Sequence, residues 1–170
     1  MERRHIVKYT ETFQELPLSV EEMKKMGLAD LSSPSRVAAL TVVAIYAYTV
    51  NKQQGIEMID YLRGPRPLTE YEKQFLRDRL GGKEYVIKSF FQGAVPDNNY
   101  TMSKPYTVIV EDAPQVVSEE GYKRFQLRSG GADNPRTITL RNKPSTGEWF
   151  LWEQVLLADI RPPKSQDDWA

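Results

Sequence analysis

A glycine-rich segment in the last third of the chain contains residue types that could bind an anion. Residues 129–136 read Ser-Gly-Gly-Ala-Asp-Asn-Pro-Arg. Glycines let backbone N–H groups converge on a phosphate, and Arg136 could add a bidentate guanidinium with Asp133 nearby. The segment lacks the glycine spacing of the P-loop and of the dinucleotide-binding motif, and predicted strands lie on both sides of it. We therefore favour a hairpin loop in which Gly130 or Gly131 has a positive φ and Asp133 or Asn134 bonds its own backbone.

Arginines alternate with apolar residues in the two segments that flank this loop. In residues 122–128 and 137–141, apolar side chains occupy one face, and Arg124, Arg128 and Arg141 occupy the other. If the two segments pair as strands, the three arginines form one cationic face. Aromatic rings among such charges would bind single-stranded nucleic acid. Outward arginines also serve solubility alone, and we favour this second interpretation.

The aromatic run that follows contains Trp149 and Trp152, with Glu148 and Glu153 beside them. A carboxylate held against tryptophan has its pKa raised by desolvation, as general acid catalysis requires. On one regular strand, however, these two carboxylates face opposite sides, so a paired-carboxylate site is disfavoured. We expect the tryptophans to pack in the core and leave open that they line a ligand pocket. No catalytic residue is assigned.

Composition excludes several classes of function. The 23 basic and 23 acidic residues cancel, so no overall field draws the chain to nucleic acid or to an anionic membrane. The chain has no cysteine and a single histidine, His5, which disfavours zinc chemistry and a Ser-His-Asp triad. We expect no metal and no cofactor. The longest apolar run, residues 37–50, is shorter than the roughly 18 residues of a membrane span, and we expect a cytoplasmic protein.

The elements that position these residues divide into two halves. Capping residues and glycines predict four helices, over 20–26, 34–52, 56–62 and 70–80. The second is apolar on nearly every side and should be the buried centre of the core. Gly55 is expected to separate the second and third helices, and Tyr71 and Phe75 to lie on the apolar face of the fourth.

Beyond Gly82 the pattern changes to short runs rich in β-branched and aromatic residues. These runs predict about five strands, over 85–91, 106–110, 122–128, 137–141 and 148–156. The last is apolar on both sides, so we expect it at the centre of the sheet or covered on both faces. The predicted fold class is α+β, with N-terminal helices packed on a curved antiparallel sheet. We expect a single domain over 1–170, in which 1–15 and 162–170 are flexible or peripheral and Trp169 anchors the end.

Motifs spread over nearly the whole chain resemble a known family. They lie at residues 35–40, 64–68, 74–80, 98–100, 129–133, 145–154 and 168–170, and include GPRPL, STGEWFLWEQ and DWA. Together they resemble an uncharacterised bacterial domain family that has no assigned activity. The resemblance implies a bacterial, single-domain protein and assigns no site residue. The order of helices followed by a curved sheet is also similar to the cone-shaped nuclear-transport-factor-2-like fold, whose members include enzymes, ligand binders and dimerisation modules.

Three classes of function follow from these observations. We favour a non-catalytic interaction or ligand-binding module with a protein or small-molecule partner. The alternative is a small-molecule enzyme with a pocket between the helices and the strand at residues 149–152. A second alternative is a weak binder of single-stranded nucleic acid. Nucleic acid and membrane are disfavoured as partners, and an oligomer is compatible with the sequence. The candidate binding residues are Arg124, Arg128, Asp133, Arg136, Arg141, Trp149 and Trp152.

Overall fold

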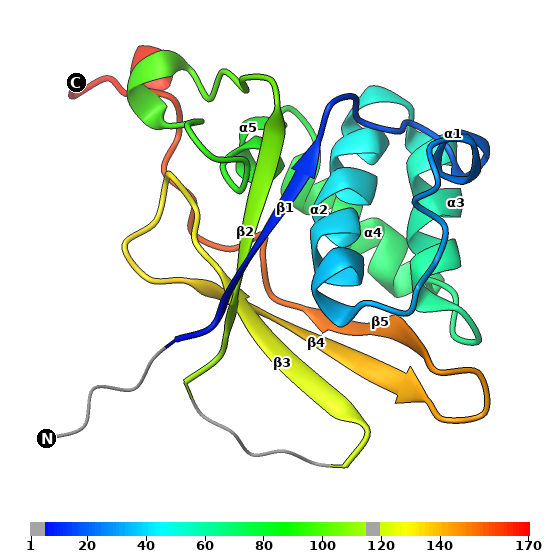
Figure 1. The fold of residues 1–170 in the computed structure, drawn as a ribbon. Helices are drawn as coiled ribbons and strands as arrows, with labels where there is room; N and C mark the ends of the chain where they lie inside the picture. The colour runs from blue at the N-terminus through cyan, green and yellow to red at the C-terminus, as the bar shows by residue number, and fades with distance from the viewer. Residues whose placement is uncertain (1–5, 115–119) are drawn as a thin grey trace, which may run out of the picture.

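A five-stranded antiparallel sheet forms the frame of the protein. The computed structural model describes residues 6–114 and 120–170. The strands follow one another across the sheet in chain order: β1 (Lys8–Phe13), β2 (Tyr106–Asp112), β3 (Tyr122–Leu127), β4 (Arg136–Lys143) and β5 (Glu148–Gln154). The sheet is strongly curved, and helices lie together on one side of it (Figure 1). The predicted α+β class with an antiparallel sheet is confirmed.

The helices occupy the first half of the chain. They are α1 (Val20–Lys25), α2 (Pro34–Val50), α3 (Lys52–Arg63), α4 (Glu70–Leu80) and the short α5 (Tyr85–Lys88), with 3₁₀ turns η1 (Pro96–Asn98) and η2 (Lys164–Gln166). The predicted caps are present, since the side chains of Ser19, Ser33 and Thr69 each accept a backbone N–H of the helix that they begin. Within the described residues, no helix is both long and apolar enough to cross a bilayer.

Helix α2 is the centre of the core. It contacts all five strands on one side and α3 on the other. Leu40 and Ile45, in the middle of α2, are almost fully buried. An apolar surface all round the helix is therefore what this position requires, because each side faces other protein atoms. The predicted buried helix is confirmed.

The predicted strand over residues 85–91 is wrong. Tyr85–Lys88 forms α5, and backbone bonds of the i to i+3 type continue through Phe91. Ile87, Phe90 and Phe91 are buried in the core. A short apolar run without clear alternation has the same composition in a buried strand and in a buried helical turn, so the pattern did not separate them.

The fifth strand comes from the N-terminal part of the chain. Residues 8–13 pair with β2, from Lys8 opposite Glu111 to Phe13 opposite Tyr106, within the segment expected to be flexible or peripheral. This strand forms one edge of the sheet, and Phe13 is buried. Residues 1–5, including His5, lie outside the described residues.

Strand β5 forms the opposite edge, so its predicted central position is wrong. Other groups satisfy part of its free edge. The Trp149 N–H donates to the carbonyl of Leu31 over 2.8 Å, and the carbonyl of Trp152 accepts from the Arg66 guanidinium. An edge strand covered in this way can be apolar on both sides without exposing an open row of backbone groups.

Gly55 does not separate α2 from α3. Asn51 does so, because it ends α2 and its side chain accepts the Gln54 N–H to begin α3. Gly55 lies inside α3, where an added Cβ would overlap the backbone of Tyr48. The glycine is therefore explained by the close approach of two helices, and the predicted break is wrong.

Candidate functional site

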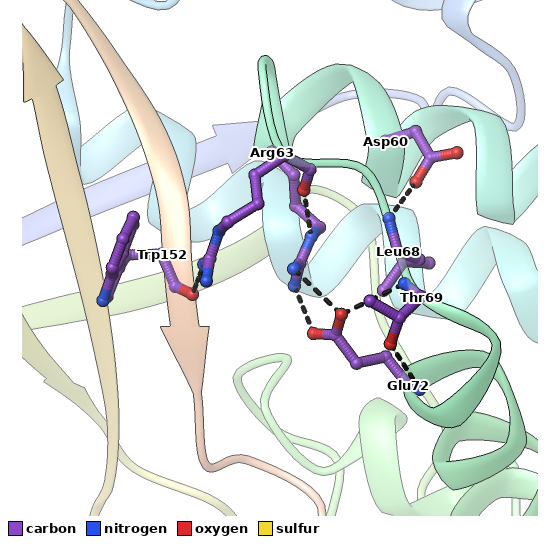
Figure 2. Close-up of polar contacts among 7 residues, drawn as sticks. Asp60, Arg63, Leu68, Thr69, Glu72 and Trp152 are labelled. Atoms are coloured by element: carbon purple, nitrogen blue, oxygen red, sulfur yellow. Dashed lines mark hydrogen bonds and ion pairs between the residues drawn. The ribbon is translucent and has the colours of Figure 1, made fainter.

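The connection between α3 and α4 is held by side chains from both helices. Asp60 accepts the Leu68 N–H at Oδ1 over 2.8 Å, and Arg63 Nε donates to the Arg66 carbonyl over 2.8 Å (Figure 2). Gly64 begins the connection with a φ of 62° and a ψ of −118°, a combination that favours glycine. These bonds fix a short loop whose residues lie beside β5.

A partly buried ion pair joins the same two helices. The Arg63 side chain is only 7% exposed, and its Nη1 lies 2.9 Å from Glu72 Oε2 while Nη2 donates to Oε1 over 3.1 Å. Glu72 is also the N3 residue of the capping box that begins α4, so it bonds Thr69 as well (Figure 2). Burial raises the pKa of Glu72, but the hydrogen bonds with Thr69 and the charge of Arg63 together hold this pKa below its usual value. The carboxylate therefore stays ionised opposite Arg63.

Arg66 extends from this loop over the ring of Trp152. The guanidinium carbon lies 3.8 Å from the ring centroid, and that of Arg141 lies 4.7 Å from the same centroid. Tyr122 adds an edge contact with Trp152 at 5.5 Å between ring centroids. Burial lowers the pKa of Arg66, and the neighbouring charge of Arg63 lowers it further, with a smaller effect of Arg141. The guanidinium groups of Arg66 and Arg141 thus both form cation–π contacts with the indole of Trp152.

A β-bulge places Trp152 in this position. Leu140 pairs with Leu151 and Thr139 pairs with Glu153, so Trp152 is an additional residue in β5. Leu151 is buried on the side of the helices, whereas Trp152 joins the opposite face. Because successive residues of a strand point to opposite faces, Leu151 joins the core while Trp152 contacts Arg66, Arg141 and Tyr122.

A groove of about 460 Å³ opens between α4 and β5 at this edge of the sheet. Its apolar surface comes from Ile45, Ile59, Leu76 and Leu151, which are themselves buried. Tyr71 and Phe75 stand one turn apart on α4 and line the groove with 80% and 38% of their surfaces exposed. Arg66, Glu72, Trp152 and Glu153 add polar and aromatic groups. We define these residues as the α4–β5 groove.

Two of the predicted site residues meet at the margin of this groove. Arg141 and Trp152 are in contact, as described above. Arg124 lies two residues from Tyr122 along β3, so it is on the same face of the sheet as Tyr122 and Arg141. Its side chain is exposed. Trp149 is half-buried and packs against the core. Figure 1 shows β3, β4 and β5 side by side below the helices.

Arg128 does not join a free cationic face. Its Nε lies 3.1 Å from Oε1 of Glu111, a carboxylate that is only 2% exposed and that also accepts from Gln126. The charge of Arg128 is therefore balanced within the sheet. The structure does not bring all of the predicted arginines together as one patch of unpaired charge.

The loop at residues 129–136 bonds to its own protein. The Arg136 guanidinium donates to three carbonyl oxygens, those of Asn134, Ala158 and Asp159. The Asp133 carboxylate lies 3.1 Å from Nη1 of Arg161. Both charged groups of the hypothetical phosphate site are thus used in holding the loop against the C-terminal segment.

The predicted positive φ at Gly130 or Gly131 is wrong, because neither is among the described residues with positive φ. An added Cβ at Gly130 would overlap the carbonyl oxygen of Ala94, and one at Gly131 would overlap the hydroxyl of Tyr100. The two glycines permit close packing of the loop instead of a left-handed turn. Within the described residues, no group of three or more His, Cys, Asp or Glu side chains is placed to hold a metal.

Sequence reasoning missed the residues that build the groove wall. It placed Tyr71 on the apolar face of its helix, whereas Tyr71 is largely exposed. The available signal was Arg66, which lies between Pro65 and Pro67 shortly before a capping box. Such a stiff, short connection holds its side chain close to whatever lies beside it.

These features define an α+β domain with an open antiparallel sheet and a preformed groove at one sheet edge. The chain belongs to the family described as "Domain of unknown function (DUF6935)", which matches residues 15–164. The predicted membership of an uncharacterised domain family is thereby confirmed. No curated protein and no solved structure shows significant similarity to the chain. The likeness to nuclear-transport-factor-2-like folds stays a prediction.

Proposed function

We propose that the protein is a non-catalytic binding module whose α4–β5 groove takes a large apolar side chain from a peptide segment of a partner protein. The observation that carries this proposal is the exposure of Tyr71 and Phe75 beside an apolar groove of about 460 Å³. A volume of this size is within the range of ligand sites. Exposed aromatic side chains that border such a groove are typical of interaction surfaces.

The rigid frame around the groove supports binding. The Arg63–Glu72 ion pair and the Asp60–Leu68 bond fix the loop between α3 and α4 before any ligand arrives. In a preformed site, binding loses less conformational entropy because the side chains are already ordered, and the affinity is correspondingly higher. Helix α4 is held at its N-terminal end by the same Glu72, so the position of Tyr71 is also set.

Acid–base catalysis in this groove receives less support. Glu72 is a partner of Arg63 and of the capping box, and its pKa is lowered by those contacts although burial alone raises it. A general acid near neutral pH needs a raised pKa and a free proton. Glu153, the other carboxylate that lines the groove, is exposed to solvent. The residues of the groove are therefore better suited to binding a ligand than to transferring a proton.

A protein partner is favoured over nucleic acid. Arg128 is balanced by Glu111, and the chain as a whole carries no net charge. Non-specific binding of nucleic acid depends on several free cations along one surface. We also propose a cytoplasmic location, with which a chain that has no cysteine, and so needs no oxidising compartment to fold, is compatible.

Selection from a displayed peptide library tests this function. Peptides selected on the wild-type protein should bind Tyr71→Ala roughly tenfold more weakly or worse, as truncation of a central aromatic residue at an interface does. Because Tyr71 is mostly exposed, the variant should keep its fold, which a thermal melt checks. Arg124→Ala, outside the groove, is the matched control and should bind as wild type does. Equal affinity for wild type and Tyr71→Ala would refute the proposal.

A further inference from the structure

Trp169 is the most exposed large hydrophobic side chain in the described parts of the protein, with 95% of its surface in solvent. The expectation that it anchors the end of the chain against the body is therefore wrong. Tryptophan is highly buried on average, so a fully solvated indole on an ordered segment points to a contact with another molecule.

The segment that carries Trp169 is a fixed turn. Asp167 accepts the Trp169 N–H at Oδ1 over 2.9 Å and the Ala170 N–H at its carbonyl over 3.2 Å. The preceding turn η2 is fastened to η1 by the bond from Ser165 to Asn99 at 3.2 Å. These bonds order the backbone that carries Trp169, and the indole itself is almost fully exposed.

The groove of the same molecule lies out of reach of this turn. Figure 1 shows the C-terminal segment beside η1, on the far side of the molecule from α4 and β5. Turn η2 ends at Gln166, and only Asp167 and Asp168 separate it from Trp169, so Trp169 lies at most about 11 Å of chain from the end of η2. A tryptophan presented here can therefore enter only the groove of a different molecule.

We propose that Trp169 of one copy inserts into the α4–β5 groove of a second copy, with Asp168 beside Arg66. This inference rests on the proposed function and names the partner. The indole would pack on the apolar surface of the groove between Tyr71 and Phe75, the aromatic side chains that line it. Aromatic pairs in offset or edge contact add stabilisation beyond the burial of their area.

Charge complementarity favours the same arrangement. Arg66 and Arg141 both lie against the ring of Trp152, and within the described residues neither forms an ion pair with a carboxylate. Asp168 directly precedes Trp169 and likewise has no cationic partner in the described parts of the chain. A carboxylate beside Arg66 would relieve the repulsion between the two guanidinium groups.

The contact joins two different surfaces, so it is heterologous and produces rings or open chains of copies. One tryptophan and its neighbours bury much less area than a stable interface of roughly 1,200 Å² or more, so the association should be weak and concentration-dependent. Sedimentation velocity over a range of protein concentrations measures this property directly.

Complementary variants make the sedimentation test specific. Trp169→Ala keeps the groove and lacks the inserted side chain, whereas Tyr71→Ala keeps Trp169 and has a damaged groove. Wild type should sediment faster as its concentration rises, and each variant alone should not. A mixture of the two variants should form a one-to-one complex, because one intact groove and one intact Trp169 remain. Arg124→Ala is the control and should associate as wild type does.

A labelled peptide of residues 161–170 separates this inference from the proposed function. Fluorescence anisotropy should show saturable binding of the peptide to Trp169→Ala protein, and at least roughly tenfold weaker binding to the Tyr71→Ala,Trp169→Ala double variant. A peptide with Trp169→Ala should not bind. If library-selected peptides occupy the groove and this peptide does not, the self-association proposal is overturned and the proposed function stands. If neither kind of peptide binds the groove, both are overturned. Undiminished self-association of Trp169→Ala would also overturn the inference.

Discussion

Replacing Gly64 with alanine should destabilise the protein through two separable effects. Gly64 has a φ of 62° and a ψ of −118°, where an L-residue is strained; strain of this kind costs about 1–3 kcal/mol. The added Cβ would also overlap the ring of Phe150, and forced overpacking costs about 1–3 kcal/mol. Together they should lower the free energy of unfolding by roughly 2–6 kcal/mol.

Urea denaturation monitored by circular dichroism measures this loss, and Gly82→Ala provides the matched control. Gly82 has a φ of 69° with nothing near its added Cβ, so Gly82→Ala reports the effect of a positive φ without a steric overlap. Adding Phe150→Leu to Gly64→Ala should recover part of the difference, which a double-mutant cycle quantifies. If Gly64→Ala destabilises no more than Gly82→Ala does, the loop is not packed against β5 as we describe.

Three further substitutions test the contacts that stabilise the fold. Burial raises the pKa of Glu72, but its capping bonds and the charge of Arg63 lower it on balance, so this pair stabilises the fold above the unfolded pKa of about 4.3 and stops doing so as pH falls through the lower folded value. The urea midpoint of wild type should therefore fall more steeply below pH 5 than that of Glu72→Gln, and parallel curves would contradict the pairing. Gly131→Ala should cost about 1–3 kcal/mol, because its Cβ displaces the buried Tyr100 hydroxyl, and a thermal melt equal to wild type would exclude that contact. Ile45→Asp should abolish soluble folding, since it places an unpaired charge at the centre of α2, and a cooperative melt of this variant would show that reasoning to be wrong.

The helices could be predicted from sequence because their signals are local. Ser19, Ser33 and Thr69 each stand at the start of a helix, and a cap acts only on the backbone within the next few residues. Strands β2 to β5 were recognised from alternation and β-branched residues for the same reason. Short-range signals are therefore sufficient to predict where these helices begin and which segments form strands β2 to β5.

The errors arose where tertiary packing decides the structure. Within the apolar run at residues 85–91, Tyr85–Lys88 folds as α5 against α2, and Phe91 packs on Tyr46 of α2 and Tyr106 of β2, although the composition of the run also fits a strand. Gly55 was predicted to break a helix, but it lies within α3 and allows the close approach of α2 and α3. Residues 8–13 contain the strand-forming types Tyr9, Thr10, Thr12 and Phe13, but the short segment carries no run of apolar residues, and β1 is held in the sheet by its pairing with β2. None of these causes is visible within a short window of sequence.

Some residues of the candidate site could be predicted from sequence and others could not. Trp152 and Arg141 were selected from sequence as candidate residues, and the structure places them in contact. Arg66 and Tyr71 were not selected, because their approach to β5 depends on how the loop between α3 and α4 folds back on the sheet. The ion pair of Arg63 and Glu72, which fixes that loop, joins residues nine positions apart across a turn. Periodicity within one element cannot indicate such a pair.

The most direct test of the binding function is a map of where a peptide contacts the protein. Uniformly ¹⁵N-labelled Trp169→Ala protein, titrated with a peptide selected on the wild type, should show amide shifts concentrated at residues 71–76 and 151–154. The α4–β5 groove predicts this pattern because those segments form its two walls. Shifts concentrated at residues 129–136, with the amides of α4 and β5 unchanged, would contradict the proposal that this groove is the binding site.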